Sequence, residues 1–154
     1  MFRNILIAND LSDASRPALQ AGLELARVLG ARVSVLYVTM PAYPVDHWYV
    51  PHIGEEAAVL KTLSDREQEA ARQTLEQSVR DLGADQASVS LQIKVGAPAE
   101  VILDGINELK VDLVVVGTHG RHGVERLILG STAEKIARKA PCSVLTVHPS
   151  EVKA

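Results

Sequence analysis

Residues 111–120 read VDLVVVGTHG, an apolar run that ends in two closely spaced glycines. Except for Asp112, the stretch Val111–Val116 is apolar, and it is rich in β-branched residues, which is typical of a strand covered on both faces. No other expected strand is as apolar, so we place this one at the centre of a sheet. The glycines that follow mark the place where the chain turns out of the strand.

Strands and helices alternate along the rest of the chain. Polar and apolar residues alternate over Ser88–Val95, which predicts a strand with one wetter face, near an edge of the sheet. Strict alternation of strands and helices favours a parallel sheet with right-handed crossovers and helices on both faces. The prediction is a Rossmann-like, doubly wound α/β domain over residues 1–150, with five strands in the order 3-2-1-4-5, and a tail at 151–154. The remaining strands are expected at 4–8, 31–38 and 143–147, and helices at about 17–30, 55–82, 98–109 and 131–139.

The longest expected helix, at 55–82, follows an irregular loop, Thr39–Gly54, that contains three prolines. Good helix formers dominate this helix, and its charged residues are expected on the outer face. Its apolar residues are available to pack on the sheet. The expected outer residues are Arg66, Glu67, Glu69 and Arg72, and the expected packing residues are Ala58, Leu60, Leu63, Ala70 and Leu75.

The composition is that of one ordinary globular domain. The chain has 154 residues, of which 47% are hydrophobic and 23% are charged, and its formal net charge is −3. A slight acidic excess and only 3% aromatic residues argue against nucleic acid as the main partner. The apolar runs are too short to cross a membrane. The single thiol, Cys142, cannot form an internal disulfide and no signal-like segment precedes the first strand, so we expect a cytoplasmic protein.

Glycine and hydroxyl residues after the central strand are placed as in a site for an anion. Gly117 and Gly120 can present backbone amides closely to a ligand, because glycine has no side chain and tolerates positive φ. Gly130 precedes Ser131 and Thr132 at the expected start of a helix, where free amides and a partial positive charge suit a phosphate. The alternative is a simple turn and a helix cap, and the combination of three glycines favours anion binding.

The first strand ends in Asn9 and Asp10, next to the central strand in the predicted order. Ligands of such sheets bind at the carboxyl ends of the strands where the order reverses. A carboxylate at Asp10 can accept two hydrogen bonds from a ribose diol. The alternative for Asp10 is a turn residue or a helix cap. His119, beside the expected phosphate, is a candidate donor or proton shuttle, and a surface histidine is the alternative.

The spacing Gly117-x-x-Gly120, nine residues, Gly130-Ser131 resembles the ATP-binding signature of the universal stress protein family. The flanking sequence and the opening ILIANDLSDAS are also similar to that family, so nearly the whole chain is included. Two places depart from it. Asn9 stands where a small or apolar residue is often found, and for the variable loop at 39–56 the family gives no guidance.

The resemblance implies roles for individual residues. Asp10 is similar to the acidic residue near the ribose, and Val38 to the position whose backbone meets the adenine. It also implies a homodimer, often joined through the last strand, here Ser143–Val147, which would otherwise leave an apolar edge bare. The residues that correspond to those around ribose and phosphates are Gly117, Gly120, Gly130, Ser131 and Thr132.

Other chemistries fit less well. A P-loop needs a lysine before its hydroxyl residue, but Leu129 and Gly130 precede Ser131 and the next lysine is Lys135. No glycine follows the first strand, where a dinucleotide fold needs one. The spacing of the histidine pairs at 119/122 and 47/52 is not that of a metal site. Trp48 either lines a lid over the base or packs within its own loop, and Cys142 is expected to be a small apolar residue rather than a nucleophile.

The function these patterns predict is a cytoplasmic regulatory dimer that binds ATP or AMP, with Mg²⁺ accompanying a triphosphate through its oxygens. Two alternatives stay open. One is a slow ATPase in which His119 or Ser131 positions water, although the missing lysine disfavours fast turnover. The other is a protein-interaction module that shares the fold without binding nucleotide.

Overall fold

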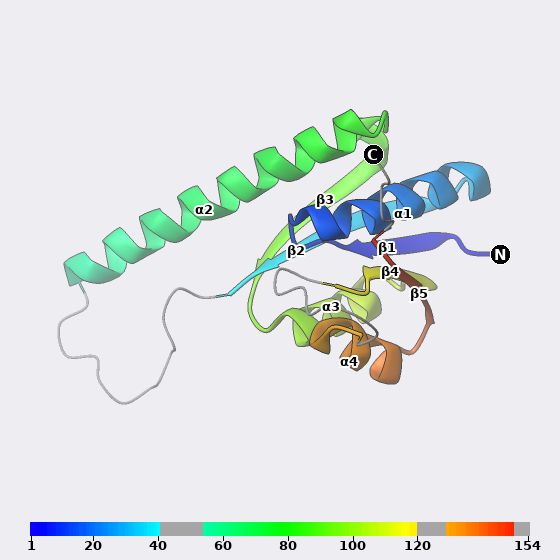
Figure 1. Ribbon diagram of the computed structural model, residues 1–154. Helices are drawn as coiled ribbons and strands as arrows, with labels where there is room; N and C mark the ends of the chain where they lie inside the picture. Colours follow the sequence, from blue (N-terminus) through cyan, green and yellow to red (C-terminus); the bar gives the residue numbers. More distant parts are fainter. Residues whose placement is uncertain (41–53, 120–128, 150–154) are drawn as a thin grey trace.

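The computed structural model describes residues 1–40, 54–119 and 129–149, and of residues 54–57 only the backbone. Within these ranges five strands form one parallel sheet in the order β3-β2-β1-β4-β5, which confirms the predicted fold class (Figure 1). The strands are β1 (Asn4–Ala8), β2 (Arg32–Thr39), β3 (Val89–Val95), β4 (Leu113–Gly117) and β5 (Ser143–Val147).

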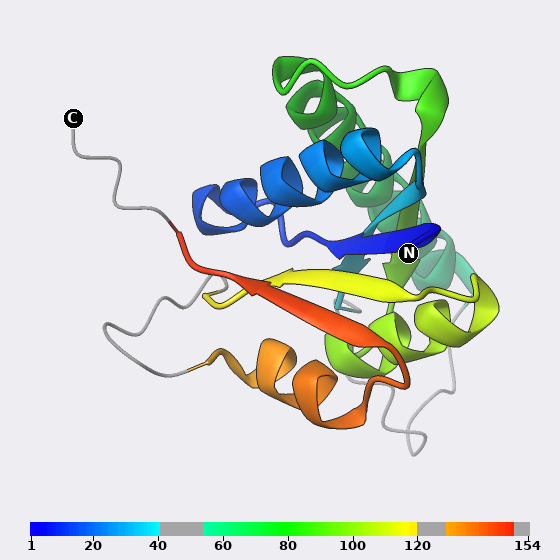
Figure 2. The same ribbon diagram turned by 90° about the vertical axis from the view of Figure 1, so that its right-hand side faces the viewer.

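Helices cover both faces of the sheet, as expected (Figure 2). Side chains at alternate positions of the central strands enter two separate apolar cores, because successive residues of a strand point to opposite faces. Ile7 and Val115 pack under α1 and α2, whereas Leu6 and Val114 pack under α3 and α4. The helices are α1 (Arg16–Leu29), α2 (Gly54–Asp81), α3 (Pro98–Glu108) and α4 (Ser131–Lys139), with short 3-10 turns η1 (Asp13–Ser15) and η2 (Gln86–Ser88).

The central strand starts later than the sequence pattern indicates. Val111 belongs to the turn that ends α3, since its N–H donates to the carbonyl of Ile106 over 2.9 Å. The preceding residue, Lys110, has the positive φ of 50° that this turn requires. The apolar character of Val111 therefore serves the α3 core rather than the strand. The expected strand Val111–Val116 is corrected to Leu113–Gly117.

Helix α2 packs on the sheet through its C-terminal part alone. A helix of 28 residues is about 42 Å long, whereas the seven residues of β3 span about 23 Å, so the helix extends past the strand it covers (Figure 1). Leu75 is fully buried as expected, together with Ala71 and Val79. The charged residues 66, 67 and 69 are exposed as expected, and Arg72 is half-buried. Four expected packing residues are instead exposed: Ala58, Leu60, Leu63 and Ala70.

Candidate functional site

The residues after β1 and β4 lie side by side at the carboxyl edge of the sheet. Ala8, the last residue of β1, pairs with Leu36 of β2 on one side and with Val116 of β4 on the other. The strand order reverses between β1 and β4, because the chain leaves β1 toward β2 and returns to the other side of β1 as β4. This is the position where doubly wound sheets hold their ligands.

Asn9 and Asp10 are fixed at this edge by local hydrogen bonds. Asn9 is 8% exposed, its N–H donates to Leu36 O over 3.0 Å, and its Oδ1 accepts from the N–H of Leu11 over 2.8 Å. The Asp10 carboxylate accepts from both the N–H and the hydroxyl of Ser12. These bonds are those of a turn residue, which was the alternative reading of Asp10. The side chain is nevertheless only half-buried, so it keeps a surface for a ligand.

A hydrogen bond joins Thr118 and Gly130, the two residues that flank the segment 119–129. The N–H of Gly130 donates to the carbonyl of Thr118 over 2.8 Å, and the N–H of Thr118 donates to Val147 O of β5 over 3.0 Å. The start of α4 is therefore held directly beside the end of β4, with the ends of β4 and β5 on the same side of the molecule (Figure 2). The predicted neighbours Gly117, Gly130 and Ser131 are brought together in this way.

The first turn of α4 carries backbone donors at this edge. The first bond of the helix runs from Glu134 N–H to Gly130 O over 2.8 Å. The amides of Ser131, Thr132 and Ala133 precede it and have no acceptor within the helix, as in the first turn of any α-helix. These amides and the helix dipole together favour an anion.

Gly117 does not use the positive φ that a glycine tolerates. Gly130 has φ −56° and ψ 151°, and Gly117 is not among the positive-φ residues, so neither needs a left-handed conformation. A Cβ on Gly117 would lie 3.6 Å from His119 O and 3.7 Å from Ala14 O. The glycines thus leave the backbone uncovered rather than allow an unusual turn.

Val38 lies at the end of β2, opposite Lys94 of β3, and is half-buried. It is two residues beyond Leu36, which pairs with the end of β1, so Val38 borders the same edge. Other candidates lie outside the described residues: Gly120, Arg121, His122, Arg126, Tyr43, His47, Trp48, Tyr49 and His52.

The structure adds two residues that the sequence patterns did not single out. Thr118 is 2% exposed, and its hydroxyl oxygen lies 2.9 Å from Nδ1 of His119 and 3.1 Å from Nδ1 of His148. His148 follows β5 directly, at the carboxyl edge that already holds Asp10 and His119. Its place after a strand of the parallel sheet is the signal that could have indicated it.

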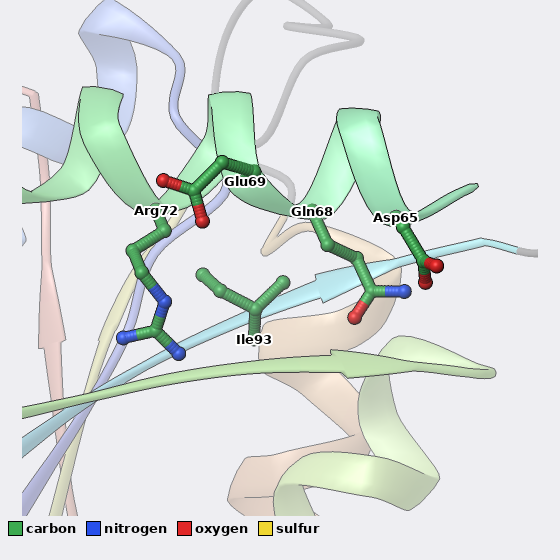
Figure 3. A pocket seen from close by; sticks show the side chains of 5 residues that line it. All are labelled: Asp65, Gln68, Glu69, Arg72 and Ile93. Atoms are coloured by element: carbon green, nitrogen blue, oxygen red, sulfur yellow. The ribbon is translucent and has the colours of Figure 1, made fainter. Parts of the chain in front are cut away.

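Two hollows on the described surface lie elsewhere. One, of about 210 Å³, is formed between α2 and β3, where Asp65, Gln68, Glu69 and Arg72 surround Ile93 (Figure 3). The other, of about 460 Å³, lies between α1 and the C-terminal end of α2. Neither includes a candidate site residue, and the polar rim of the first consists of α2 side chains around Ile93 of β3.

Burial raises the pKa of the Cys142 thiol above its ordinary value, although a backbone hydrogen bond at Val114 acts in the opposite direction. The side chain packs half-buried against the core under α3 and α4. A raised pKa favours the unreactive thiol form. Cys142 therefore has the character of a small apolar residue.

The described ranges contain neither a candidate metal-ligand cluster nor a candidate membrane-spanning helix. In those parts of the chain, no three His, Cys, Asp or Glu side chains gather closely enough to hold a metal ion. Among the described helices, none has the length and apolar character that a membrane crossing requires.

Comparison with known proteins gives consistent matches along the chain. The pattern of the universal stress protein family matches residues 1–148. A universal stress protein from Methanocaldococcus jannaschii, MJ0531, is 30% identical over 147 residues, which cover 96% of this chain and 82% of that protein. The structure of the universal stress protein UspA from Lactobacillus plantarum has a TM-score of 0.78 and 26% identity, covering 96% of this chain and 98% of the other.

Two further similar structures contain nucleotides. A universal stress protein in complex with cAMP has a TM-score of 0.64 and 23% identity, over 97% of this chain and 98% of that one. The universal stress protein from Archaeoglobus fulgidus in complex with dAMP has a TM-score of 0.59 and 21% identity, over 95% and 97%. At these identities, the likeness shows a shared fold.

Proposed function

The chain belongs to the universal stress protein family, and from this premise we propose that it binds an adenine nucleotide, ATP or AMP, between the carboxyl ends of β1 and β4. The observation that carries the proposal is the hydrogen bond from Gly130 N–H to Thr118 O, which holds the start of α4 beside the end of β4. Similar folds in complex with cAMP and dAMP support the choice of an adenine nucleotide.

The phosphates bind to main-chain donors in this proposal. The first-turn amides of α4 lie at the positive end of the helix dipole and can donate to phosphate oxygens. The glycines have no side chains, so phosphate oxygens can approach their backbone closely. His119, half-buried at the end of β4, adds a side-chain donor. The residues proposed to surround the phosphates are Gly117, His119, Gly120, Gly130, Ser131 and Thr132.

The nucleoside binds on the β1 and β2 side of the same edge. The Asp10 carboxylate accepts the ribose hydroxyls, for which its bonds to Ser12 hold it in place. The backbone at Val38 meets the edge of the adenine. Mg²⁺ accompanies a triphosphate by binding its oxygens rather than a dedicated protein site.

We propose a homodimer through β5. This strand has β4 on one side only in the sheet order, and Leu145 on it is 36% exposed. An apolar edge strand tends to pair with another strand, and two copies of β5 related by a twofold axis can pair with each other.

The dimer would act in the cytoplasm as a regulatory protein whose nucleotide occupancy follows the energy or stress state of the cell. Analytical ultracentrifugation at micromolar concentration is expected to show a dimer, and a monomer would contradict this part.

The binding itself is tested by native mass spectrometry of the purified protein, followed by calorimetric titration with ATP, AMP and adenosine. We expect retained or added adenine nucleotide, with ATP and AMP binding more tightly than adenosine because of the phosphate donors. GTP serves as the control for the base. No retained nucleotide and no heat with ATP or AMP would refute the proposal and favour a protein-interaction module.

A further inference from the structure

Three hydrogen-bonding groups surround one buried hydroxyl at the ends of β4 and β5. The Oγ1 of Thr118 lies 2.9 Å from His119 Nδ1, 3.1 Å from His148 Nδ1 and 3.4 Å from the carbonyl of Val147. The two imidazole rings are 6.2 Å apart between centroids and are tilted by 55°. Thr118 is 2% exposed, so water does not replace these partners freely.

The single hydrogen of this hydroxyl limits the tautomers of the two histidines. A threonine hydroxyl has one hydrogen to donate and two lone pairs to accept. If it donates to Nδ1 of one imidazole, the other imidazole has to donate its own Nδ1–H to the hydroxyl. If it donates to the carbonyl of Val147, 3.4 Å away, both imidazoles donate Nδ1–H to it. In neither arrangement do two neutral rings that both bond to the hydroxyl also both present Nε2–H.

One added proton is enough for both rings to present Nε2–H when the hydroxyl donates to one of them. The ring that donates through Nδ1 takes the proton on Nε2, and both rings then present Nε2–H groups with a single positive charge. A second proton would leave the carbonyl of Val147 as the acceptor for the hydroxyl, because both Nδ1 atoms would carry hydrogen. It would also place two cations 6.2 Å apart between ring centroids.

The imidazole pair lies at the proposed phosphate site. Thr118 O accepts from Gly130 N–H, the residue before α4, so the residue that holds both rings also holds the helix start. His119 is half-buried and His148 is exposed, which leaves both rings accessible to a ligand.

We propose that His148 and His119 together form a phosphate-binding pair within the nucleotide site, with Thr118 as the residue that positions both rings. This inference rests on the proposed nucleotide binding and extends it with a residue supplied by the end of β5. The pair takes one proton when phosphate binds, so that both Nε2–H groups donate to phosphate oxygens.

The proposal predicts a pH dependence with a definite sign. Because the pair takes up a proton as phosphate binds, affinity for phosphate falls as the pH rises through the neutral range. The elements packed here, namely the β1 end, η1, α1 and α4, carry other charged groups. These groups are Asp10, Asp13, Arg16, Glu134, Lys135 and Arg138, of which Glu134 and Arg138 form an ion pair at 3.0 Å.

Calorimetric titration of wild-type protein, His148→Ala and His148→Gln with ATP, AMP and adenosine at pH 6 and pH 8 tests the pair. We expect His148→Ala to weaken ATP binding at pH 6 by about ten- to a hundredfold, the effect of one lost charge-assisted hydrogen bond. Adenosine affinity should be unchanged, and the loss of affinity between pH 6 and pH 8 should be smaller than in wild type. The nucleotide's own titration is common to all variants and cancels in the comparison.

The control variants separate a binding role from a structural one. Ser143→Ala, at the other end of β5, should bind ATP like wild type. Thr118→Ser keeps the hydroxyl and should retain ATP affinity, whereas Thr118→Val removes the hydroxyl and should lose affinity. Unchanged ATP affinity in His148→Ala, or an equal loss for adenosine, would overturn the imidazole pair while leaving nucleotide binding intact. A wild-type protein that binds no adenine nucleotide would overturn both proposals.

Discussion

The two ends of the β1–β4 pair use polar residues in different ways. At the amino end the Asp112 carboxylate accepts from the N–H groups of Arg3 and Asn4 over 2.8 and 3.1 Å. The side-chain amide of Asn4 donates to the carbonyl of Lys110 over 3.1 Å. These contacts tie the start of β4 to the start of β1, so the polar groups serve the fold.

At the carboxyl end of the same strands, buried polar residues hold groups that face outward. Thr118 accepts at its carbonyl from Gly130 and holds two imidazoles on its hydroxyl. The first-turn amides of α4 lie at the same edge without acceptors in their helix. In the proposed function, polar residues at a strand end form a binding site only where their bonds leave donors available to a ligand.

The largest effect is expected from Gly130→Val, which acts at the carboxyl end. The φ of −56° and ψ of 151° at this residue suit any amino acid, so the fold should lose at most about 1 kcal/mol from a poorer helix cap. The added side chain would cover the amides of α4, and we expect nucleotide affinity to fall by more than about 100-fold, or 2.7 kcal/mol. Calorimetric titration and thermal unfolding measure the two quantities.

Gly130→Ala provides a graded control, since its single methyl group should weaken binding less than the valine side chain does. Wild-type affinity in Gly130→Val would show that the phosphates do not approach this part of the backbone. The polar groups at the carboxyl end of the β1–β4 pair would then stabilise the fold without binding a ligand, as those at the amino end do.

An effect of intermediate size is expected from Asp112→Ala, at the amino end. It removes the acceptor of two backbone N–H groups and should lower the free energy of unfolding by about 1 to 3 kcal/mol. Nucleotide affinity should stay within about twofold of wild type, because the substitution lies at the opposite end of the strands. Asp112→Asn keeps an acceptor oxygen and should lose less stability. A large loss of affinity at unchanged stability would reverse the assignment of the two ends.

The smallest effect concerns Cys142, which precedes β5 at the amino end. Burial is the main cause of its raised pKa, and the charge of Asp112 acts in the same direction. At pH 8 we expect iodoacetamide to modify this thiol several-fold more slowly than in the urea-unfolded chain. Asp112→Ala should speed the reaction slightly by lowering the pKa. Equal rates in folded and unfolded protein would show that burial does not control the thiol.

The sheet could be predicted because each strand carries its own signal of burial. Continuous apolar runs and strict alternation with helices are properties of local sequence, and they determine the order of strands through general topological rules. The overhang of α2 could not be predicted, since Leu60 and Leu75 have the same character in a helical pattern. Only the length of β3 decides which of the two is covered.

The sequence predicted a site at one edge of the sheet, and the structure pairs the strands that end there. Glycines after β4 and the acidic residue after β1 indicated this edge, because carboxyl ends of parallel strands meet there. Positive φ, one of the two properties expected of Gly117, is absent from it, and close approach of its backbone to a ligand stays a prediction. His148 was missed because its bond to Thr118 joins residues 30 positions apart.

The central claim is that nucleotide binds at the carboxyl end of the β1–β4 pair and not at the amino end. Backbone amide chemical shifts of ¹⁵N-labelled protein, followed during titration with AMP, test it residue by residue. We predict large shifts at Asp10, Thr118, Ser131 and Thr132, with Arg3, Asn4 and Asp112 unchanged. Shifts confined to the amino end, or none at saturating AMP, would contradict the account.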